Sequence, residues 1–585
     1  MSIPRPEYPR PQFARKDWMC LNGEWQFELD PGDSGHQRGL LERELTGKIT
    51  VPFCVESELS GVAHVDFIDC VWYRRQVEIP SEWAGRRVLL HFQAVDYDAT
   101  VWIDGQEVGR HRGGWGPITC DLSGVAAPGD TVTLVVRARD RILYTKSPHG
   151  KQCETYFNCG CSYTRTTGIW QTVWMEPVPD VHLKRPRITP DVANRRFRIA
   201  QPISNNTPGL RLRATLRDAA GEVATADVAA DADFAPQLDL VIPEDRVRLW
   251  GPGEPNLYDI TLELVDADGS VVDSAESYAG LRSVTIDGMA VKINGKSVFQ
   301  RQVLDQGYYP DGVMTAPSDE ALKADIELSM AVGFNSARLH QKVFEERFLY
   351  HADKLGYLVW GEFGDWGIDR QNPQATYITQ WLEVLMRDYS HPSIIGWCGL
   401  NETMMDIHDR IDGMNDLTHG MFLAAKAMDP TRPVLDASGY SHRVADVDVY
   451  DCHDYESVPK VMRERHSDLS PGNAYSNNPN ASLPHKGQPF FVSEFGGIWW
   501  NPEAAENEPS WGYGERPKTI EEFYERFGGL CDALLDSPNM FGYCYTQLTD
   551  VFQEQNGVFF FDRRAKFDIE KLHAIQTRTA AIEKE

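Results

Sequence analysis

The stretch SIIGWCGLNE, residues 393–402, is apolar along most of its length and ends in an asparagine followed by a glutamate. A short apolar run of this kind is typical of a strand buried in a parallel sheet. A carboxylate at the end of such a strand is costly to bury unless it has a partner or a task. The segments around this stretch decide what Glu402 faces.

Residues 287–585 contain eight such apolar runs in nearly strict alternation with amphipathic helical patterns. The runs are SVFQRQVLDQ, NSARLHQ, YLVWGEF, SIIGWCGLNE, PVLDAS, VDVYDCHDY, PFFVSEFGG and MFGYCYTQLTD. Helices are expected at 318–333, with Ser318 as the N-cap, and at 344–356, 375–390 and 416–429. The link between the fifth and sixth runs is too short for a full helix. The alternation predicts a catalytic (β/α)₈ TIM barrel over 287–585.

The two preceding regions have a different pattern. Residues 1–180 alternate apolar and polar side chains, as in RVLLHFQAVDYDATVWIDGQEVG, and are broken by Asp-Gly and Pro-Gly turn signals. This pattern predicts an antiparallel jelly-roll β-sandwich. Residues 181–286 hold shorter strand-like segments, and their length suits an immunoglobulin-like β-sandwich of some seven strands. The chain is therefore expected to be multidomain.

The charge composition narrows the classes of partner that the chain is expected to bind. The chain has 58 basic and 86 acidic side chains and a net charge of −28, which disfavours nucleic acid and anionic membrane surfaces as partners. We find no signal peptide at the N-terminus and no apolar run long enough to span a membrane. Eleven scattered cysteines, many in apolar runs, indicate buried thiols in a reducing compartment. A cytoplasmic location is expected, and the sequence leaves open whether the chain forms a homo-oligomer.

Polar side chains gather at the C-terminal ends of the expected strands, where the active site of a barrel forms. In strand order they are Asp305 and Gln306; Arg338 and His340; Trp360 and Glu362; Asn401 and Glu402; His453, Asp454 and Tyr455; Glu494; and Tyr545, Gln547 and Asp550. Glu402 and Glu494 each end an apolar run, on strands that lie across the barrel mouth from one another. Two such carboxyl groups are what glycosidic bond cleavage requires, one protonated and one ionised.

Nearly the whole chain resembles a glycoside hydrolase of family 2, the group of β-galactosidases, β-glucuronidases and β-mannosidases. WMCLNGEWQFELD, AVDYDATVWIDGQEVGRHRGG and TTGIWQTVWMEPV resemble its sugar-binding sandwich. SYAGLRSVTIDGMAVKINGKSVFQRQV resembles its passage into the barrel, and GLNE and VSEFGG resemble its acid/base and nucleophile strands. The resemblance implies an exo-acting, retaining glycosidase without a cofactor. It makes Glu402 the acid/base, Glu494 the nucleophile and Asn401 a donor to the sugar 2-hydroxyl.

The remaining candidates are expected to bind substrate or to support the pair. Arg338 should hold Glu494 ionised, and Tyr455 should donate a hydrogen bond to the same carboxylate. Glu362 is a rival carboxylate for which hydroxyl binding or support of the site is the alternative. The other substrate-contact candidates, each weighed against a structural role, are His340, Trp360, Asp305, Tyr545 and Gln547.

Three other interpretations stay open. His149, Cys153, Cys159 and Cys161 form a pattern that could bind zinc, but its spacing lacks a C-x-x-C pair. A long sandwich loop narrowing the barrel mouth is the preferred interpretation, and no metal is expected. A non-catalytic carbohydrate-binding protein would gain nothing from two opposed carboxylates. A metal-dependent hydrolase would lose activity on chelation.

The sugar is the open question. The family's glucuronidases carry an Asn-x-Lys element for the uronic acid carboxylate, and QEQNGVFFFDRRAKFD contains none. With the negative net charge, this favours a terminal neutral sugar and a β-galactosidase, with a galactofuranosidase or arabinosidase as the alternative. The linkage, the oligomeric state and the tryptophan that stacks on the sugar cannot be inferred from the sequence.

Overall fold

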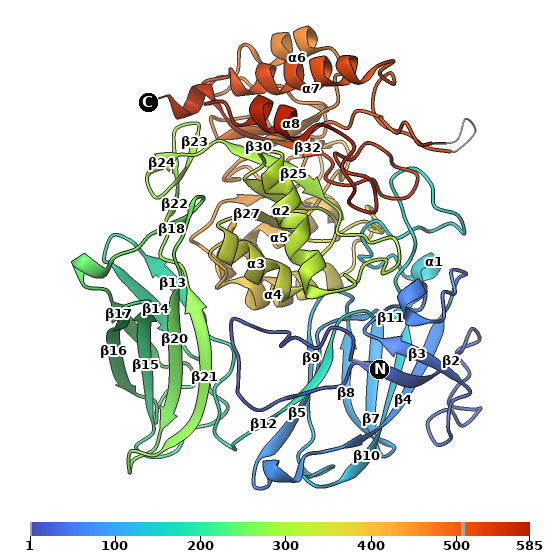
Figure 1. Ribbon diagram of the computed structural model, residues 1–585, viewed down its shortest axis with the longest axis vertical. Coiled ribbons are helices and arrows are strands. Elements are labelled where there is room, and N and C mark those ends of the chain that lie inside the picture. Colours follow the sequence, from blue (N-terminus) through green and yellow to red (C-terminus); the bar gives the residue numbers. More distant parts are fainter. Residues whose placement is uncertain (1–2, 505–508, 585) are drawn as a thin grey trace.

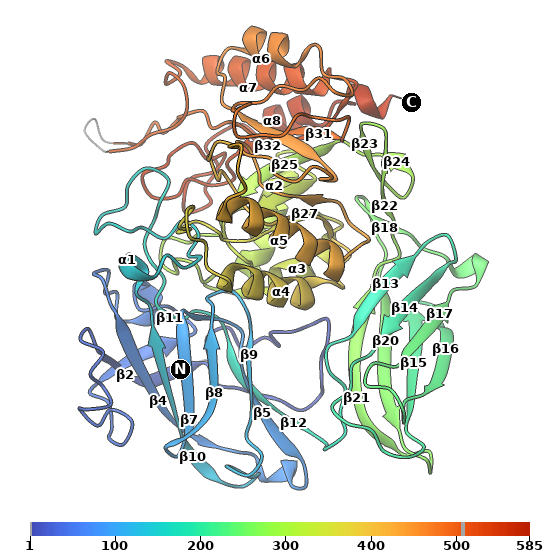
Figure 2. The ribbon, with the colours of Figure 1, turned by 180° about the vertical axis from the view of Figure 1, so that it is seen from behind.

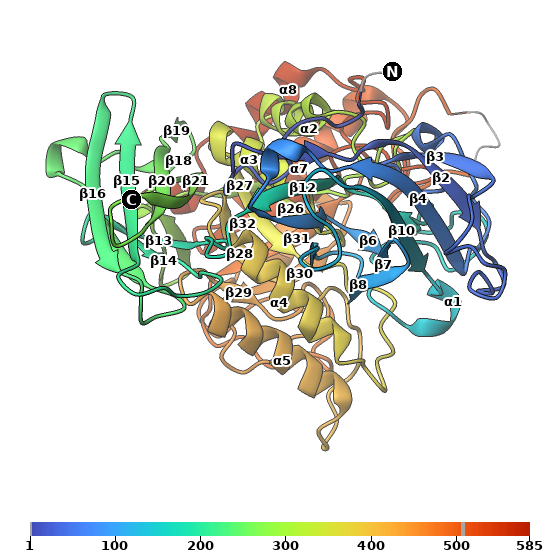
Figure 3. The ribbon, with the colours of Figure 1, turned by 90° about the horizontal axis from the view of Figure 1, so that it is seen from below.

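A computed structural model describes residues 3–504 and 509–584 of the chain. Two separate β-sandwiches lie below the barrel, the second at the lower left and the first at the lower right of Figure 1, and these places are exchanged in the reverse view of Figure 2. Seen from below in Figure 3, the two sandwiches lie on opposite sides of the barrel helices. The predicted multidomain architecture is therefore correct.

The first sandwich packs two antiparallel sheets over an apolar core that includes Trp25, Tyr73 and Val101. One sheet has the order β1-β12-β5-β9, the other β3-β2-β4-β10-β7-β8, and β6 and β11 form a separate pair. The bounds are β1 (Met19–Cys20), β2 (Gly23–Leu29), β3 (Gly47–Val51), β4 (Cys70–Glu78), β5 (Arg87–Phe92), β6 (Val95–Asp96), β7 (Asp98–Ile103), β8 (Gln106–Arg112), β9 (Ile118–Asp121), β10 (Thr131–Arg139), α1 (Ile142–Thr145), β11 (Gly168–Ile169) and β12 (Val173–Val178).

The second sandwich has sheets of three and four antiparallel strands, in the orders β13-β14-β17 and β16-β15-β20-β21. Alternate residues such as Leu212, Ala214 and Leu216 face its core, because successive side chains of a strand point to opposite faces. The bounds are β13 (Arg187–Asp191), β14 (Arg196–Ala200), β15 (Arg211–Asp218), β16 (Gly221–Ala229), β17 (Gln237–Val241), β20 (Tyr258–Val265) and β21 (Val271–Ala279).

The barrel is one parallel sheet in the order β29-β28-β27-β26-β25-β32-β31-β30. Its strands are β25 (Gln300–Asp305), β26 (Ser336–Leu339), β27 (Leu358–Glu362), β28 (Ile394–Cys398), β29 (Val434–Leu435), β30 (Tyr450–Asp454), β31 (Phe490–Gly496) and β32 (Met540–Thr546). Its helices are α2 (Asp319–Ala331), α3 (Glu346–Leu355), α4 (Thr376–Asp388), α5 (Gly413–Met428), α6 (Pro459–His466), α7 (Ile520–Leu535) and α8 (Ile569–Gln576). As expected, residues 436–449 between β29 and β30 hold no helix.

Two small sheets lie between the second sandwich and the barrel. They consist of β18 (Trp250–Gly251) with β19 (Glu254–Pro255), and of β22 (Val284–Asp287), β23 (Ala290–Ile293) and β24 (Lys296–Ser297). Apolar side chains of this region, Trp250, Val291 and Ile293, pack with the inward residues Trp360 and Phe491 of the barrel. This cluster closes the floor of the barrel and leaves its mouth for the site.

The segment before the first sandwich and a loop within it tie the domains together. Arg5 binds Glu345 of the barrel through two hydrogen bonds of 3.0 and 2.8 Å. The loop over residues 146–167, which follows α1, reaches the barrel, where the His149 amide donates to the Trp366 carbonyl at 2.9 Å. Within residues 3–504 and 509–584, no helix has the length and apolar character to cross a membrane.

Candidate active site

The backbone places Glu402 at the mouth of the barrel. Beyond the end of β28, the chain continues its parallel pairing, because the Ser438 amide donates to the Leu400 carbonyl at 2.8 Å. The Glu402 amide in turn donates to the Ser438 carbonyl at 2.9 Å. Glu402 adopts a positive φ of 51°, a conformation that is uncommon for non-glycine residues and that occurs at functional sites. The strand thus ends in a turn that holds this side chain at the rim.

Glu402 and Glu494 face each other across His453. The Nδ1 atom of His453 lies 2.8 Å from Glu402 Oε1 and 3.3 Å from Glu494 Oε2. One ligand atom from each of the three residues lies within 4.8 Å of the other two. The two carboxylates therefore share one small space, close enough to act on a single anomeric carbon. The same three atoms have a spacing that could hold a cation.

Glu494 is held as a carboxylate by several donors. Arg338 donates to its Oε1 atom at 2.8 Å, and the Tyr455 hydroxyl donates to its Oε2 atom at 2.6 Å. Although burial favours the neutral acid, the positive charges of His453 and Arg338 lower the Glu494 pKa to about 2. The sequence-based expectations for Arg338 and Tyr455 match this geometry.

Arg338 organises the floor beneath the pair. Its Nε atom donates to Glu362 at 2.5 Å, and its Nη2 atom donates to Asn401 Oδ1 at 2.6 Å. The Asn401 side chain is thereby fixed with its Nδ2 donor buried and without a partner in the described chain. His340 Nδ1 lies 3.0 Å from Glu362, and burial holds the His340 pKa well below its ordinary value.

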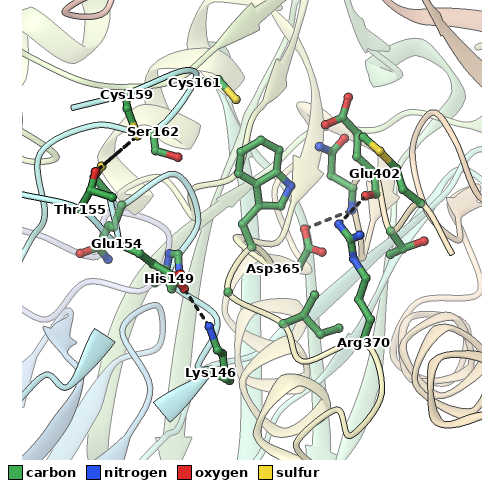
Figure 4. Close-up of a pocket in the computed structure, with 18 residues that line it drawn as sticks. Lys146, His149, Glu154, Thr155, Cys159, Cys161, Ser162, Asp365, Arg370 and Glu402 are labelled. Carbon is green, nitrogen blue, oxygen red and sulfur yellow. Dashed lines mark hydrogen bonds and ion pairs between the residues drawn. The ribbon is translucent and has the colours of Figure 1, made fainter. Parts of the chain in front are cut away.

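A cavity of about 570 Å³ opens beside Glu402. Figure 4 shows its two sides: Lys146, His149 and Cys159 project from the sandwich loop, and Asp365 and Glu402 project from the barrel. The loop over residues 146–167 therefore narrows the barrel mouth, as the sequence predicted. Residues from two domains form the walls of this cavity.

The structure gives other contacts to three of the expected substrate-contact residues. Trp360 is buried in the barrel floor, where its ring nitrogen donates to Gln300 at 2.7 Å. Tyr545 points outward and packs against Phe527 of α7. Asp305 accepts a hydrogen bond from the Gly307 amide at 2.9 Å. Trp360 and Tyr545 have packing roles, so we do not retain them as sugar contacts, whereas the substrate contact expected of Asp305 stays a prediction.

The other two candidates lie closer to the pair. Glu362 is buried beneath Arg338 and also accepts from the Gln341 amide at 3.0 Å, so it supports the site instead of contacting a ligand. Gln547 is buried at the end of β32 and donates to Asn556 at 2.8 Å. The Oε1 atom of Gln547 has no partner among the described residues.

The cysteine-rich loop does not gather its side chains as a metal site does. Cys153 Sγ and Cys159 Sγ lie 3.8 Å apart. His149 Nδ1 faces the Gly150 carbonyl at 2.9 Å, and its Nε2 faces Glu154 at 3.3 Å. Across residues 3–504 and 509–584, the clusters with metal-ligand spacing are Asp30-Asp33-Cys70 and Glu402-His453-Glu494, and neither includes this loop.

Three sequence profiles of one family match the chain in order and together cover more than half of it. They are described as the family 2 sugar binding domain over residues 18–145, glycosyl hydrolases family 2 over residues 181–282, and the family 2 TIM barrel domain over residues 285–501. The chain belongs to glycosyl hydrolase family 2. It is accordingly an O-glycosyl hydrolase that acts on glycosides, in a family whose typical mechanism is retaining.

Two named relatives illustrate the similarity of this family 2 chain. A β-glucuronidase from Paenibacillus borealis is 26% identical over 445 residues, which are 71% of this chain and 72% of the relative. A β-galactosidase from Thermoanaerobacter pseudethanolicus is 25% identical over 68% of this chain, and the match spans about half of that relative, 52%. The relatives thus differ in the sugar that their names specify.

Solved structures share the whole architecture. A β-glucuronidase from Lactobacillus rhamnosus superposes with a TM-score of 0.78 at 21% identity, covering 98% of this chain and 99% of that one. A Ruminococcus gnavus β-glucuronidase in complex with D-glucuronic acid gives a TM-score of 0.77 at 20% identity, with the same coverage. At this level of identity the likeness establishes the fold.

Two residues that the structure places near the carboxylate pair were not among the expected catalytic or substrate-binding residues. His453 lies between the two carboxylates, and its place at the end of β30 was the available signal, because Asp454 and Tyr455 follow it. Lys151 lies behind the cavity on the sandwich loop. Its loop was predicted to reach the barrel, but no local pattern distinguishes its lysine from a surface lysine.

Proposed function

We propose that the protein is an exo-acting, retaining β-glycosidase in which Glu494 is the nucleophile and Glu402 the acid/base. The observation that carries this proposal is the shared contact of both carboxylates with His453, which keeps ligand atoms of the three residues within 4.8 Å of one another. Retaining glycosidases have carboxyl groups about 5–5.5 Å apart, whereas inverting enzymes need a clearly larger gap for water.

The first step follows from the charge state of the pair. Glu494, with its pKa lowered to about 2, is ionised at neutral pH and attacks the anomeric carbon. Glu402 donates its proton to the glycosidic oxygen, so the leaving alcohol departs neutral and a glycosyl ester forms on Glu494. The Asn401 Nδ2 donor, which has no partner in the described residues, is free to bind the sugar 2-hydroxyl.

The second step restores the enzyme. Glu402, now a carboxylate, takes a proton from water, and the resulting hydroxide displaces Glu494 from the anomeric carbon. Two displacements at one carbon retain its configuration. Arg338 and Tyr455 stabilise the negative charge that returns to Glu494, through the hydrogen bonds that they already donate to it.

For the sugar, the absence of an Asn-x-Lys element in QEQNGVFFFDRRAKFD supports a galactoside, with arabino- and galactofuranosides as variants of this proposal. The second candidate is a β-glucuronide, because several similar proteins are named β-glucuronidases. A panel of nitrophenyl glycosides with galacto, glucurono, gluco, manno and arabino configurations, in both ring sizes where these exist, separates the candidates by kcat/KM.

The role of Glu494 is tested by Glu494→Ala. We expect kcat to fall by about 10⁴-fold or more, and added azide to restore part of the turnover as a glycosyl azide of inverted configuration. A 2-deoxy-2-fluoro glycoside should leave a covalent sugar on the Glu494 peptide in mass spectrometry. A folded variant without azide rescue, together with a label on another residue, would falsify the assignment.

The role of Glu402 is tested by Glu402→Gln, with Glu464→Gln on the exposed face of α6 as the matched control. Loss of acid catalysis should lower kcat/KM by about 10²- to 10⁴-fold for poor leaving groups. Dinitrophenyl glycosides, whose leaving group needs no proton, should lose much less in the glycosylation step. Equal losses for both leaving groups would remove Glu402 from the acid role.

A further inference from the structure

Lys151 extends from the sandwich loop into the interface with the barrel. Its backbone is fixed, because the Tyr163 amide donates to the Lys151 carbonyl at 2.7 Å. The residue is 5% exposed, although lysines are almost never fully buried without a partner. Tyr163 is itself anchored to the barrel, since its hydroxyl donates to the buried Glu554. The position of Lys151 is therefore set by both domains.

The Lys151 ammonium lies between two aromatic rings. Its Nζ atom is 5.3 Å from the ring centroid of Trp366, a wall residue of the cavity beside Glu402, and 5.9 Å from that of Tyr163. No hydrogen bond or ion pair of this ammonium occurs among the residues that the structure describes. Cation–π contact recovers only part of the cost of removing an ammonium from water. The Lys151 ammonium can donate three hydrogen bonds and makes none of them with the described residues.

Nearby acidic groups, with the two catalytic carboxylates among them, keep this cation charged. Although burial favours the neutral amine, the negative charges of Cys161 in its thiolate form, Glu554, Glu494 and Glu402 raise the Lys151 pKa above its ordinary value. The influence is mutual, because Lys151 also contributes to the low pKa of Glu494. Lys151 is therefore within electrostatic range of both catalytic residues.

Stabilisation of the Glu494 carboxylate does not explain why the Lys151 ammonium is buried at this position. Both oxygens of Glu494 already have strong donors, Arg338 at 2.8 Å and Tyr455 at 2.6 Å, and His453 lies 3.3 Å away. The ammonium of Lys151, which lies behind the cavity wall formed by Trp366, instead lacks an acceptor among the described residues. The nearby amide oxygen of Gln306, whose Nε2 donates to Tyr163 at 3.1 Å, also lacks a partner among the described residues.

We propose that Lys151 is a specificity-determining residue that binds the terminal sugar, its ammonium donating hydrogen bonds to acceptor oxygens of that sugar. The acceptor is either the carboxylate of a uronic acid or the hydroxyls of a neutral sugar, and the chemistry of recognition is the same. This inference rests on the proposed glycosidase function. It assigns part of sugar selection to the first sandwich, while bond cleavage belongs to the barrel.

The test uses Lys151→Met, which keeps the length of the side chain without its charge, and Lys151→Arg, which keeps the charge. Lys460→Met, at an exposed position on α6, is the matched control. Loss of hydrogen bonds from a charged donor should lower kcat/KM by about 10- to 100-fold on the preferred glycoside, chiefly through KM. Lys151→Arg should recover part of the loss, and Lys460→Met should match the wild type.

Two substrate arms identify the acceptor. A loss confined to the nitrophenyl glucuronide assigns a carboxylate, and a loss on the galactoside or arabinoside assigns hydroxyls. The proposal is overturned if Lys151→Met stays within threefold of the wild type on every cleaved glycoside. It is also overturned if the whole loss reflects a shift of the acidic limb of the pH profile, which would make Lys151 a tuner of Glu494.

Two controls keep the outcomes distinct. If the wild type cleaves no glycoside in the panel, the proposed function fails before Lys151 is in question. If Lys151→Met unfolds at a lower temperature, Lys151→Gln and calorimetric binding of the free sugar product measure affinity independently of turnover. Unchanged product affinity in a folded Lys151 variant would exclude a binding role.

Discussion

His453 holds one ring nitrogen between two negative charges. Burial opposes protonation of its ring, but Glu494 and Glu402 together raise the His453 pKa above its ordinary value. Its other nitrogen lies 3.0 Å from the Ser438 hydroxyl, which fixes the ring orientation. A proton shared between His453 and Glu402 therefore reduces the repulsion between the two carboxyl groups.

This geometry predicts a pH-dependent stability. Because the folded-state pKa of His453 is raised, its stabilising effect is fully present below the unfolded value of about 6.5 and is lost as the pH rises through the folded-state value. We expect His453→Asn to lower the unfolding temperature more at pH 5.5 than at pH 9. Thermal scans of both proteins across this range measure the difference, and a constant difference would contradict the proposed charge state.

Tyr455 contributes a hydroxyl and a ring to the site. The hydroxyl donates to Glu494, and the ring stacks on Tyr513 with centroids 3.4 Å apart. Tyr455→Phe keeps the stack and removes the donor, so kcat/KM should fall by about 10- to 100-fold, the value of a hydrogen bond to a charged group. Tyr545→Phe, at a tyrosine that packs on α7, should change kcat/KM less than threefold. Comparable losses in both variants would contradict our placement of the two rings.

At the scale of elements, apolar runs and helical periodicity predicted the eight barrel strands and the helices α2 to α5, whereas α6, α7 and α8 were not among the expected helices. Ser318 illustrates this, because its hydroxyl accepts from the Ala321 amide at 3.2 Å and begins α2 where the sequence predicted a helix. Ser318→Ala should destabilise the protein by about 1 kcal/mol without changing kcat. Thermal unfolding with parallel kinetics checks this expectation, and Ser318→Asp, which retains a capping oxygen, should remain close to the wild type.

Side-chain direction within the strands was harder to predict. Trp360 faces into the barrel but lies two residues below Glu362, about 6.6 Å nearer the floor, and therefore joins the apolar cluster. Tyr545 points outward to α7. The pairing shifts register between Val359 and Trp360 and again between Val492 and Phe495. Such irregularities change which side chains face inward, and strand alternation read from one sequence does not reveal them.

The pairing of Glu402 with Glu494 was predictable for a physical reason. Both end apolar strands, and all parallel strands of a barrel deliver their C-terminal residues to one rim. Lys151 was not predictable, because it comes from another domain through a loop whose path depends on contacts such as that of Tyr163 with Glu554. Long-range docking of this kind has no local sequence signal.

At the scale of the whole molecule, the N-terminal segment joins the domains through buried ion pairs. Arg15 lies between the two sandwiches, where it binds Asp273 of β21 at 2.8 Å, Glu176 of β12 at 3.2 Å and the Leu183 carbonyl at 2.6 Å. Removing one partner of a buried ion pair leaves uncompensated charge behind. The arrangement of the sandwiches therefore depends on this residue.

Arg15→Met tests the coupling. We expect a destabilisation of about 3–5 kcal/mol, with earlier proteolysis at the junction between the sandwiches. Arg38→Met, at a half-exposed ion pair within the first sandwich, should cost about 1 kcal/mol or less. Denaturant unfolding and limited proteolysis measure both variants. Equal effects would show that Arg15 does not tie the domains together.

Because the loop over residues 146–167 docks on the barrel, one segment of the chain supplies a wall of the cavity and another supplies the reacting carboxylates. Glu402 belongs to the barrel, whereas the facing wall of the cavity beside it is formed by residues about 250 positions earlier in the chain. Mutations can therefore remodel that wall without disturbing the reacting carboxylates. Such a design lets ligand preference drift between descendants while their chemistry stays the same, and grafting foreign loops at this position is a direct route to new preferences.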